Sequence, residues 1–208
     1  MRRAAAALAA FGLLSAGCLG GLQRSAPQKE RYVFAPERAG GGEGPGRGAL
    51  YVERVEMSPL FEGAGFVYRT SDARFERDFY REFFAPPGSL VRETLRGWLA
   101  ASGLFDRVDA DRPSGAAWRL AARGDELYAD LREPAAPRAV VAIAFELRPA
   151  RGARDELVFA KAYSAAELAS DGSPAALVGA WSRALARVYA ALEADLRSAS
   201  FDRPAARR

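Results

Sequence analysis

One cysteine constrains this chain more than any other residue. Cys18 is the only cysteine, and it stands directly after Leu13-Leu14-Ser15-Ala16-Gly17. Before that segment lie Arg2, Arg3 and an apolar stretch over 4–14, which is too short to span a bilayer as a helix. A basic start, a short apolar core and small residues before a cleavage point are typical of a secretory signal. A cysteine at the cleavage point indicates a bacterial lipoprotein signal, although Ser15 stands where leucine is usual. The alternative is an ordinary signal peptide with an unrelated cysteine.

The lipoprotein interpretation determines which residues remain in the mature chain. We expect residues 1–17 to be removed and Cys18 to be the lipid attachment site, which leaves 191 residues. That length suits one domain with its own hydrophobic core, formed without a disulfide. Loss of Arg2 and Arg3 lowers the formal net charge from +4 to +2, and the remaining arginines are interspersed with acids. A nucleic-acid-binding face needs clustered basic residues, so we expect no nucleic-acid partner.

The residue types needed for catalysis are scarce. The chain has no histidine, which removes the commonest general base and metal ligand. Its paired acids have an arginine within one to three positions, so a solvated, charge-balanced surface is favoured over a glycosidase or cation site; these acids are Asp72, Glu76, Asp78, Glu82, Asp109 and Asp111. The glycine-rich segment 40–48 lacks the Lys-Ser/Thr ending of a phosphate loop. We therefore expect a protein that is not an enzyme and has no catalytic, metal or cofactor site.

Composition divides the mature chain into three parts. Residues 18–31 contain few core-forming residues and predict a lipid-anchored flexible tether, which spans roughly 20 Å as a coil. Residues 32–200 predict a single α/β domain, and residues 201–208 predict a basic disordered tail. Within the domain, Gly40–Gly48 predicts an exposed, mobile loop, because so glycine-rich a segment does not hold regular structure.

Two one-sided apolar stripes predict helices. The first, over 89–102, has Ser89 as N-cap and ends at Gly103; the second, over 174–197, follows Ser173 and has Pro174 in its first turn. Strands are predicted over 32–34, 49–57, 65–70, 105–109, 117–122, 126–131, 140–148 and 156–164. This order predicts an α/β fold: a single sandwich in which a mostly antiparallel or mixed sheet is covered by two main helices. Trp98, Trp118 and Trp181 are expected in its core.

Residues 74–84 (RFERDFYREFF) fit two structures. As a helix, the five aromatic side chains form one clean stripe, and periodicity alone favours this interpretation. As a strand, Phe75, Phe79 and Phe83 share a face with two arginines. Core packing is the first explanation of these aromatic residues. The second is a surface for a protein partner, because aromatic residues and arginine are enriched at interface anchors.

The order of motifs resembles the ABC-type transport auxiliary lipoproteins, the family of the paraquat-inducible lipoprotein. The resemblance runs over about 32–197, and its motifs are the cysteine at 18, Tyr32-Val33-Phe34, Phe66-Val67-Tyr68-Arg69, the aromatic segment to Phe84, the capped helix from Ser89, Phe105-Asp106-Arg107-Val108, Phe145-Glu146-Leu147 and the closing helix. The sequence departs from the family at Phe84-Ala85-Pro86-Pro87, where Trp-x-Glu-Pro is usual, and at Met57-Ser58-Pro59-Leu60, which is followed by glycines.

The resemblance implies a fold detail, a location and a partner. It implies that 74–84 is at least partly strand, and we adopt the strand against the periodicity. It implies a periplasmic domain, lipid-anchored at the outer membrane, that tethers the periplasmic MCE-type protein of an ABC lipid transporter; Leu19, where Asp would favour inner-membrane retention, fits that location. Arg69, Phe83 and Phe84 are the candidate partner contacts. An envelope-assembly lipoprotein that activates or scaffolds cell-wall machinery is the alternative function, and a homo-oligomer is left open.

Overall fold

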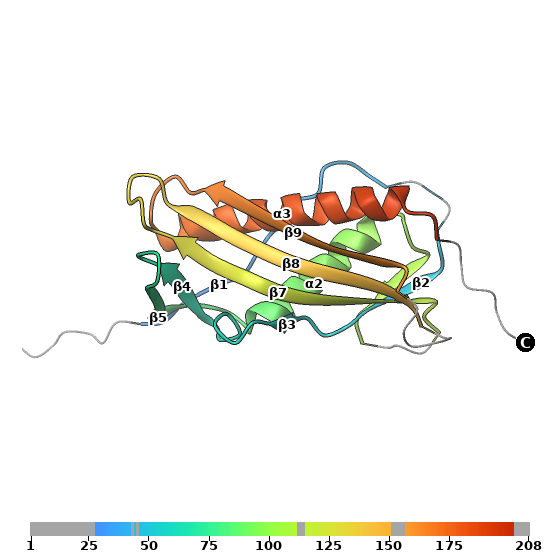
Figure 1. Ribbon diagram of the computed structural model, residues 1–208, viewed down its shortest axis with the longest axis horizontal. Coiled ribbons are helices and arrows are strands. Elements are labelled where there is room, and N and C mark those ends of the chain that lie inside the picture. Colours follow the sequence, from blue (N-terminus) through green and yellow to red (C-terminus); the bar gives the residue numbers. More distant parts are fainter. Residues whose placement is uncertain (1–27, 43, 45, 112–114, 151–156, 202–208) are drawn as a thin grey trace, which may run out of the picture.

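The computed structural model describes residues 28–42, 44, 46–111, 115–150 and 157–201. Within these residues the chain forms one nine-stranded sheet and two helices, and both helices lie on the same face of the sheet (Figure 1). The elements are β1 (Glu30–Tyr32), β2 (Ala49–Val52), β3 (Glu56–Met57), β4 (Gly65–Arg69), β5 (Phe75–Phe83), α2 (Pro87–Ala101), β6 (Arg107–Asp109), β7 (Trp118–Asp130), β8 (Arg138–Pro149), β9 (Phe159–Leu168) and α3 (Pro174–Ser198). The predicted α/β fold, with two helices over a mixed sheet, is confirmed.

The long strand β7 organises the sheet. One of its edges pairs in antiparallel fashion with β8, which in turn pairs with β9. Its other edge is shared by three short parallel strands: β2 at one end, β3 in the middle and β4 at the far end. Beyond them, β6 pairs with β2, and β5 and then β1 extend the sheet from β4. The sheet is therefore mixed, and it does not close.

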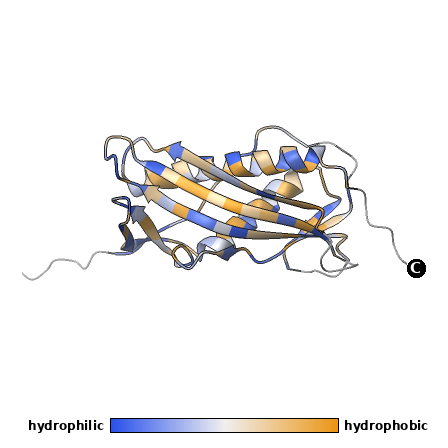
Figure 2. Cartoon of the chain, viewed as in Figure 1, coloured by the Kyte–Doolittle hydropathy of each residue, from blue (hydrophilic) through white to orange (hydrophobic). Residues whose placement is uncertain are grey.

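The core lies between this sheet and the two helices. Alternate residues of β8 are buried on the helix side, namely Ala139, Val141, Ile143, Phe145 and Leu147. The predicted stripe of α3 is buried throughout, with Trp181 at 0% exposure, and Trp98 and Trp118 are buried as well. The other face of β8 carries half-buried valine and alanine, so the strand is hydrophobic along most of its length (Figure 2). A strand covered on one face and partly covered on the other is what its composition predicts.

Two of the predicted helix ends agree with the structure and one does not. The Ser173 side chain caps α3 by accepting a hydrogen bond from the Ala176 N–H at 3.3 Å, as predicted. Gly103 follows α2 with φ of 69°, the left-handed conformation that favours glycine after a helix. The N-cap of α2 is a correction, because the helix begins at Pro87 and Pro86 takes the cap position without a side-chain hydrogen bond. Pro87 supplies the preset φ of the first helical position, and Ser89 lies inside the first turn.

Two strand predictions are corrected by irregular pairing. The predicted strand over 49–57 is two strands, because Val52 pairs with Leu120 but Glu56 pairs with Arg123, and the extra residue breaks the ladder. The predicted strands over 117–122 and 126–131 are one strand, β7. Its register against β8 shifts between Gly124 and Glu126, so a bulge absorbs one residue without ending the pairing.

The ends of the packed region also differ from prediction. β1 begins at Glu30, inside the predicted tether, and ends at Tyr32, so the predicted strand over 32–34 is shifted toward the N-terminus. Its backbone pairs with 81–83 of β5, and Lys29 and Arg31 add ion pairs to Glu82. β6 and β9 both begin later than predicted, and β9 runs on to Leu168. Phe201, the first residue of the predicted tail, is buried against Trp118. The remaining tail residues, the predicted leader 1–17, and Cys18 with the tether up to residue 27 lie outside the described residues.

The described part of the glycine-rich segment 40–48 has no regular structure and exposes Gly40, Gly41 and Gly44, as predicted, but two of its other glycines pack closely on the domain. The backbone of Gly42 lies directly against the carbonyl of Ser102, and Gly46 lies against Asp106. Arg47 next to it donates hydrogen bonds to the Leu196 and Ala199 carbonyls at the end of α3. The absence of a side chain at Gly42 and Gly46 therefore allows the backbone to approach the domain closely, so part of the predicted mobile loop is docked.

Candidate functional site

Of the three predicted contact residues, Arg69 ends β4, Phe83 ends β5 and Phe84 follows β5 directly, and their environments differ. Phe83 is 3% exposed and packs its ring on Phe34, Phe66 and Trp181, so it belongs to the core. The expectation that Phe83 contacts a partner is corrected accordingly. Phe84, its neighbour, is 69% exposed and presents its ring to solvent.

The side chain of Arg69 makes contacts within the domain. Its guanidinium lies over the ring of Phe75, 5.7 Å from the centroid. Its N–H groups donate to the backbone carbonyls of Ser71 at 3.3 Å and Asp72 at 3.0 Å. These bonds close the turn between β4 and β5, so the first role of Arg69 is to hold that turn.

A large bulge explains the conflicting patterns in 74–84. The segment is strand, as the resemblance implies, and the helix favoured by periodicity is wrong. Against β4, Arg77 pairs with Val67, whereas Glu82 pairs with Gly65. Two steps along β4 therefore face five steps along β5. Three extra residues invert the alternation, so Phe75 packs with Phe61 and Tyr128 on the outer face while Phe83 enters the core on the helix side.

Asp78 holds the bulge in place. Its Oδ1 accepts hydrogen bonds from the backbone N–H of Tyr80 at 2.8 Å and of Arg81 at 3.0 Å, and its Oδ2 accepts from the Tyr68 hydroxyl at 2.9 Å. Burial raises the pKa of the Asp78 carboxyl, but the hydrogen bonds from Arg81, Tyr80 and Tyr68 outweigh it and leave this pKa below its usual range. The bulge is thus built on an ionised, partly buried carboxylate.

The bulge presents two aromatic side chains to solvent. Phe79 is 71% exposed and Tyr80 is 43% exposed, with their rings edge to face at 5.1 Å. The ammonium of Lys29 lies 5.1 Å from the centroid of Phe79. We call Lys29, Arg31, Phe79, Tyr80 and Arg81 the bulge surface.

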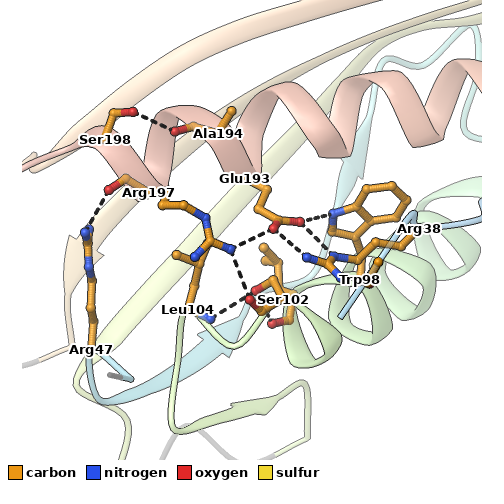
Figure 3. A network of polar contacts seen from close by, with 11 residues as sticks. Arg38, Arg47, Trp98, Ser102, Leu104, Glu193, Ala194, Arg197 and Ser198 are labelled. Carbon is orange, nitrogen blue, oxygen red and sulfur yellow. Dashed lines mark hydrogen bonds and ion pairs between the residues drawn. The ribbon is translucent and has the colours of Figure 1, made fainter. Parts of the chain in front are cut away.

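A buried charge network lies at the other end of the helices (Figure 3). Glu193 of α3 is 9% exposed, and its carboxylate accepts from the Arg38 guanidinium and from the Trp98 indole N–H at 2.8 Å. Arg197 adds a bond to the same carboxylate at 2.9 Å and another to the Ser102 carbonyl at 3.1 Å. The hydrogen bond from Arg38 is the main reason that the Glu193 pKa lies below its usual range, and Arg197 and Trp98 add to it against the effect of burial.

An open groove runs beside this network. It has a volume of about 470 Å³ and is lined by alanines of α3 together with Arg38, Trp98 and Glu193. Every oxygen of Glu193 is engaged, so the carboxylate has no free lone pair aimed into the groove for proton transfer. The network connects the 34–40 segment to α2 and α3, and it stabilises the packing of these three parts.

Within the part of the chain that the structure describes, five of the six acids singled out in the sequence are paired with basic residues, and Asp111 is not among them. The expectation of a solvated surface fails for Glu82 and Asp78, whose side chains are only 15% and 10% exposed. The ion-pair partners are Arg132 for Asp72, Arg74 for Glu76, Arg81 for Asp78, Lys29 and Arg31 for Glu82, and Arg107 for Asp109. Among the described residues, no cluster of acids could hold a metal ion. In the same part of the chain, no helix is long and apolar enough to cross a membrane.

Comparisons with known proteins identify solved structures that share this fold. No family model matches the sequence, and no curated protein matches it. Protein XCC0632 from Xanthomonas campestris, described with family model DUF330, superposes with a TM-score of 0.66 at 15% identity, covering 81% of this chain and 99% of that one. The crystal structure of an uncharacterized protein superposes with a TM-score of 0.65 at 17% identity and the same coverage. At these identities the likeness shows that the fold is shared.

Proposed function

We propose that this chain is a lipid-anchored protein of the bacterial envelope that acts by binding and supports an ABC/MCE-type lipid transport system. It would hold the periplasmic MCE-type component of that system at the outer membrane. The observation that carries the proposal is the lone Cys18 at the end of a short leader, followed by a domain whose motifs fall in the order of the auxiliary lipoproteins. The fold shared with the DUF330 protein is in keeping with it.

Binding fits the described site better than catalysis. The buried carboxylate of Glu193 is held by three side chains, and Asp78 is held by backbone and side-chain donors. Groups that are fully satisfied and kept ionised in this way stabilise a structure and have little capacity to exchange protons with a substrate.

Phe84 is the contact residue that we retain in the proposal. Its exposed ring follows directly after β5, at the position where the family has tryptophan, and large exposed aromatic side chains are common interface anchors. Arg69 is kept as a secondary candidate, because its side chain is 23% exposed and its donors serve the β4–β5 turn. Phe83 is not retained.

Two measurements test the anchor and its location. Mass spectrometry of the mature N-terminus should find an acylated Cys18, and a free amine at any other residue would contradict the anchor. Sucrose-gradient fractionation of the envelope should place the protein in the outer membrane. Recovery with the inner membrane would contradict the outer-membrane part of the proposal alone.

The partner is tested by capture from solubilised envelopes with the full lipidated chain. The MCE-type protein should be recovered with the wild type and with Leu157→Ala, an exposed leucine outside the proposed contact, and less of it with Phe84→Ala. Recovery of cell-wall synthesis proteins in its place would favour the envelope-assembly function. Equal recovery with both variants would remove Phe84 from the contact.

A further inference from the structure

On the bulge surface, a hydrogen-bonded carboxylate holds two aromatic side chains in exposed positions. Asp78, whose side chain is 10% exposed, uses both carboxylate oxygens to hold a three-residue bulge whose outward positions are Phe79 and Tyr80. Aromatic rings held in water lose the free energy that burial would give them, and tyrosine and phenylalanine beside cations are typical of surfaces that meet an apolar or interfacial phase. We therefore expect the bulge surface to be covered by another molecule or phase.

The charges around the rings are arranged in two layers. The cations Lys29, Arg31 and Arg81 have side chains that are 41%, 56% and 47% exposed. Two of their acidic partners, Glu82 and Asp78, are only 15% and 10% exposed and lie beneath them. Glu30 is the exception at 56%. The outermost layer is mostly cationic around an aromatic centre, which complements a surface of anionic phosphates over apolar chains.

The position of the bulge surface in the chain identifies the occupant. Lys29, which lies over Phe79, is eleven peptide steps from Cys18, so even a fully extended connection spans at most about 40 Å. β5 lies at one end of the long axis of the domain, and β2 lies at the other (Figure 1). A lipid on Cys18 keeps the β5 end within reach of the bilayer, whatever other partner the domain binds.

We infer that the bulge surface contacts the phospholipid bilayer, with Phe79 and Tyr80 entering the headgroup region and Lys29, Arg31 and Arg81 facing the lipid phosphates. This inference rests on the lipid anchor proposed above. The contact would turn a loosely tethered domain into an oriented one, with its β5 end on the membrane and its β2 end directed away from it.

Quenching by brominated lipids tests the contact on the full chain as it is processed in the bacterial envelope. The protein is reconstituted into vesicles of phosphatidylethanolamine and phosphatidylglycerol with brominated acyl chains, as Phe79→Trp and, separately, as Leu157→Trp. Leu157 is 47% exposed and lies just before β9, at the β2 end of the sheet, so it is a matched control. The native tryptophans are buried and common to both variants. The tryptophan introduced by Phe79→Trp should emit at shorter wavelength and be quenched by the brominated chains. The tryptophan introduced by Leu157→Trp should show neither change.

Flotation of the vesicles separates the two proposals. If the protein floats but the two variants are quenched equally, or neither is quenched, the bilayer contact is wrong and the anchor stands. A protein that does not float has no lipid anchor, which overturns the anchor and this inference with it. An unquenched Phe79→Trp combined with weaker capture of a protein by Phe79→Ser would assign the bulge surface to that protein and overturn the bilayer contact.

Discussion

The guanidinium of Arg38 and the carboxylate of Glu193 face each other in parallel, with Nε–Oε2 at 2.9 Å and Nη2–Oε1 at 2.7 Å. The two residues are 155 positions apart, and their side chains are 13% and 12% exposed. A bidentate pair of this kind fixes orientation as well as distance. It attaches the segment that follows β1 to the far end of α3.

Breaking this pair should destabilise the domain. Glu193→Gln leaves the Arg38 guanidinium largely buried without its counter-charge and weakens the bond from the Trp98 indole. The expected loss is about 2–3 kcal/mol in the free energy of unfolding, measured by urea titration. Glu93→Gln is the matched control, because Glu93 is 63% exposed in its pair with Arg96 and should cost less than about 0.5 kcal/mol. Equal losses would show that the network adds no stability.

The same carboxylate predicts an acid-side pH dependence. The pKa of Glu193 is lower in the folded protein than in the unfolded chain, where it is about 4.3. The unfolded state therefore binds more protons in this window, and stability rises with pH. The contribution is fully present above about pH 4.3 and is lost as pH falls through the lower, folded pKa. Urea titrations from neutral to acidic pH should show a smaller loss for Glu193→Gln than for the wild type. Identical pH profiles would contradict this assignment.

Neighbouring phenylalanines should separate packing from binding. Phe83→Ala removes a ring that contacts Phe34, Phe66 and Trp181, so it should cost about 3–5 kcal/mol in stability. Phe84→Ala removes an exposed ring and should change stability by less than about 0.5 kcal/mol. Thermal and urea melts of the two variants make the comparison. A large loss for Phe84→Ala would place its ring in the core and remove it as a contact candidate.

Periodicity predicted the elements whose burial pattern runs unbroken over many residues. The stripe of α3 and the alternation in β8 are of this kind, and both were confirmed. The segment 75–83 could not be assigned in this way, because the three extra residues opposite Gly65 and Val67 are visible only once β4 is paired. Local pattern and tertiary pairing give different answers there, and the pairing decides.

The charge network was missed for a related reason. Tyr189 and Glu193 are four residues apart, so the acid falls on the buried stripe of α3, and a closer reading of that stripe could have found it. Its partner Arg38 could not have been found, because no local pattern connects residues at that separation. The bulge surface was visible only as aromatic content, and its exposure depends on the position of Asp78 in the folded sheet.

Two adjacent glycines of the 40–48 segment, Gly41 and Gly42, differ in the space around them. A Cβ on Gly42 would collide with the backbone carbonyl of Ser102, which cannot swing aside, because Ser102 is fully buried and its carbonyl accepts from Arg197. Gly42→Ala should therefore cost about 1–3 kcal/mol in urea melts. A Cβ on Gly41 would meet nothing within 4 Å, so Gly41→Ala should lie within about 0.5 kcal/mol of the wild type or slightly above it. If both variants were neutral, the segment would be a mobile loop, as its composition suggests, and its docking on α2 would be wrong.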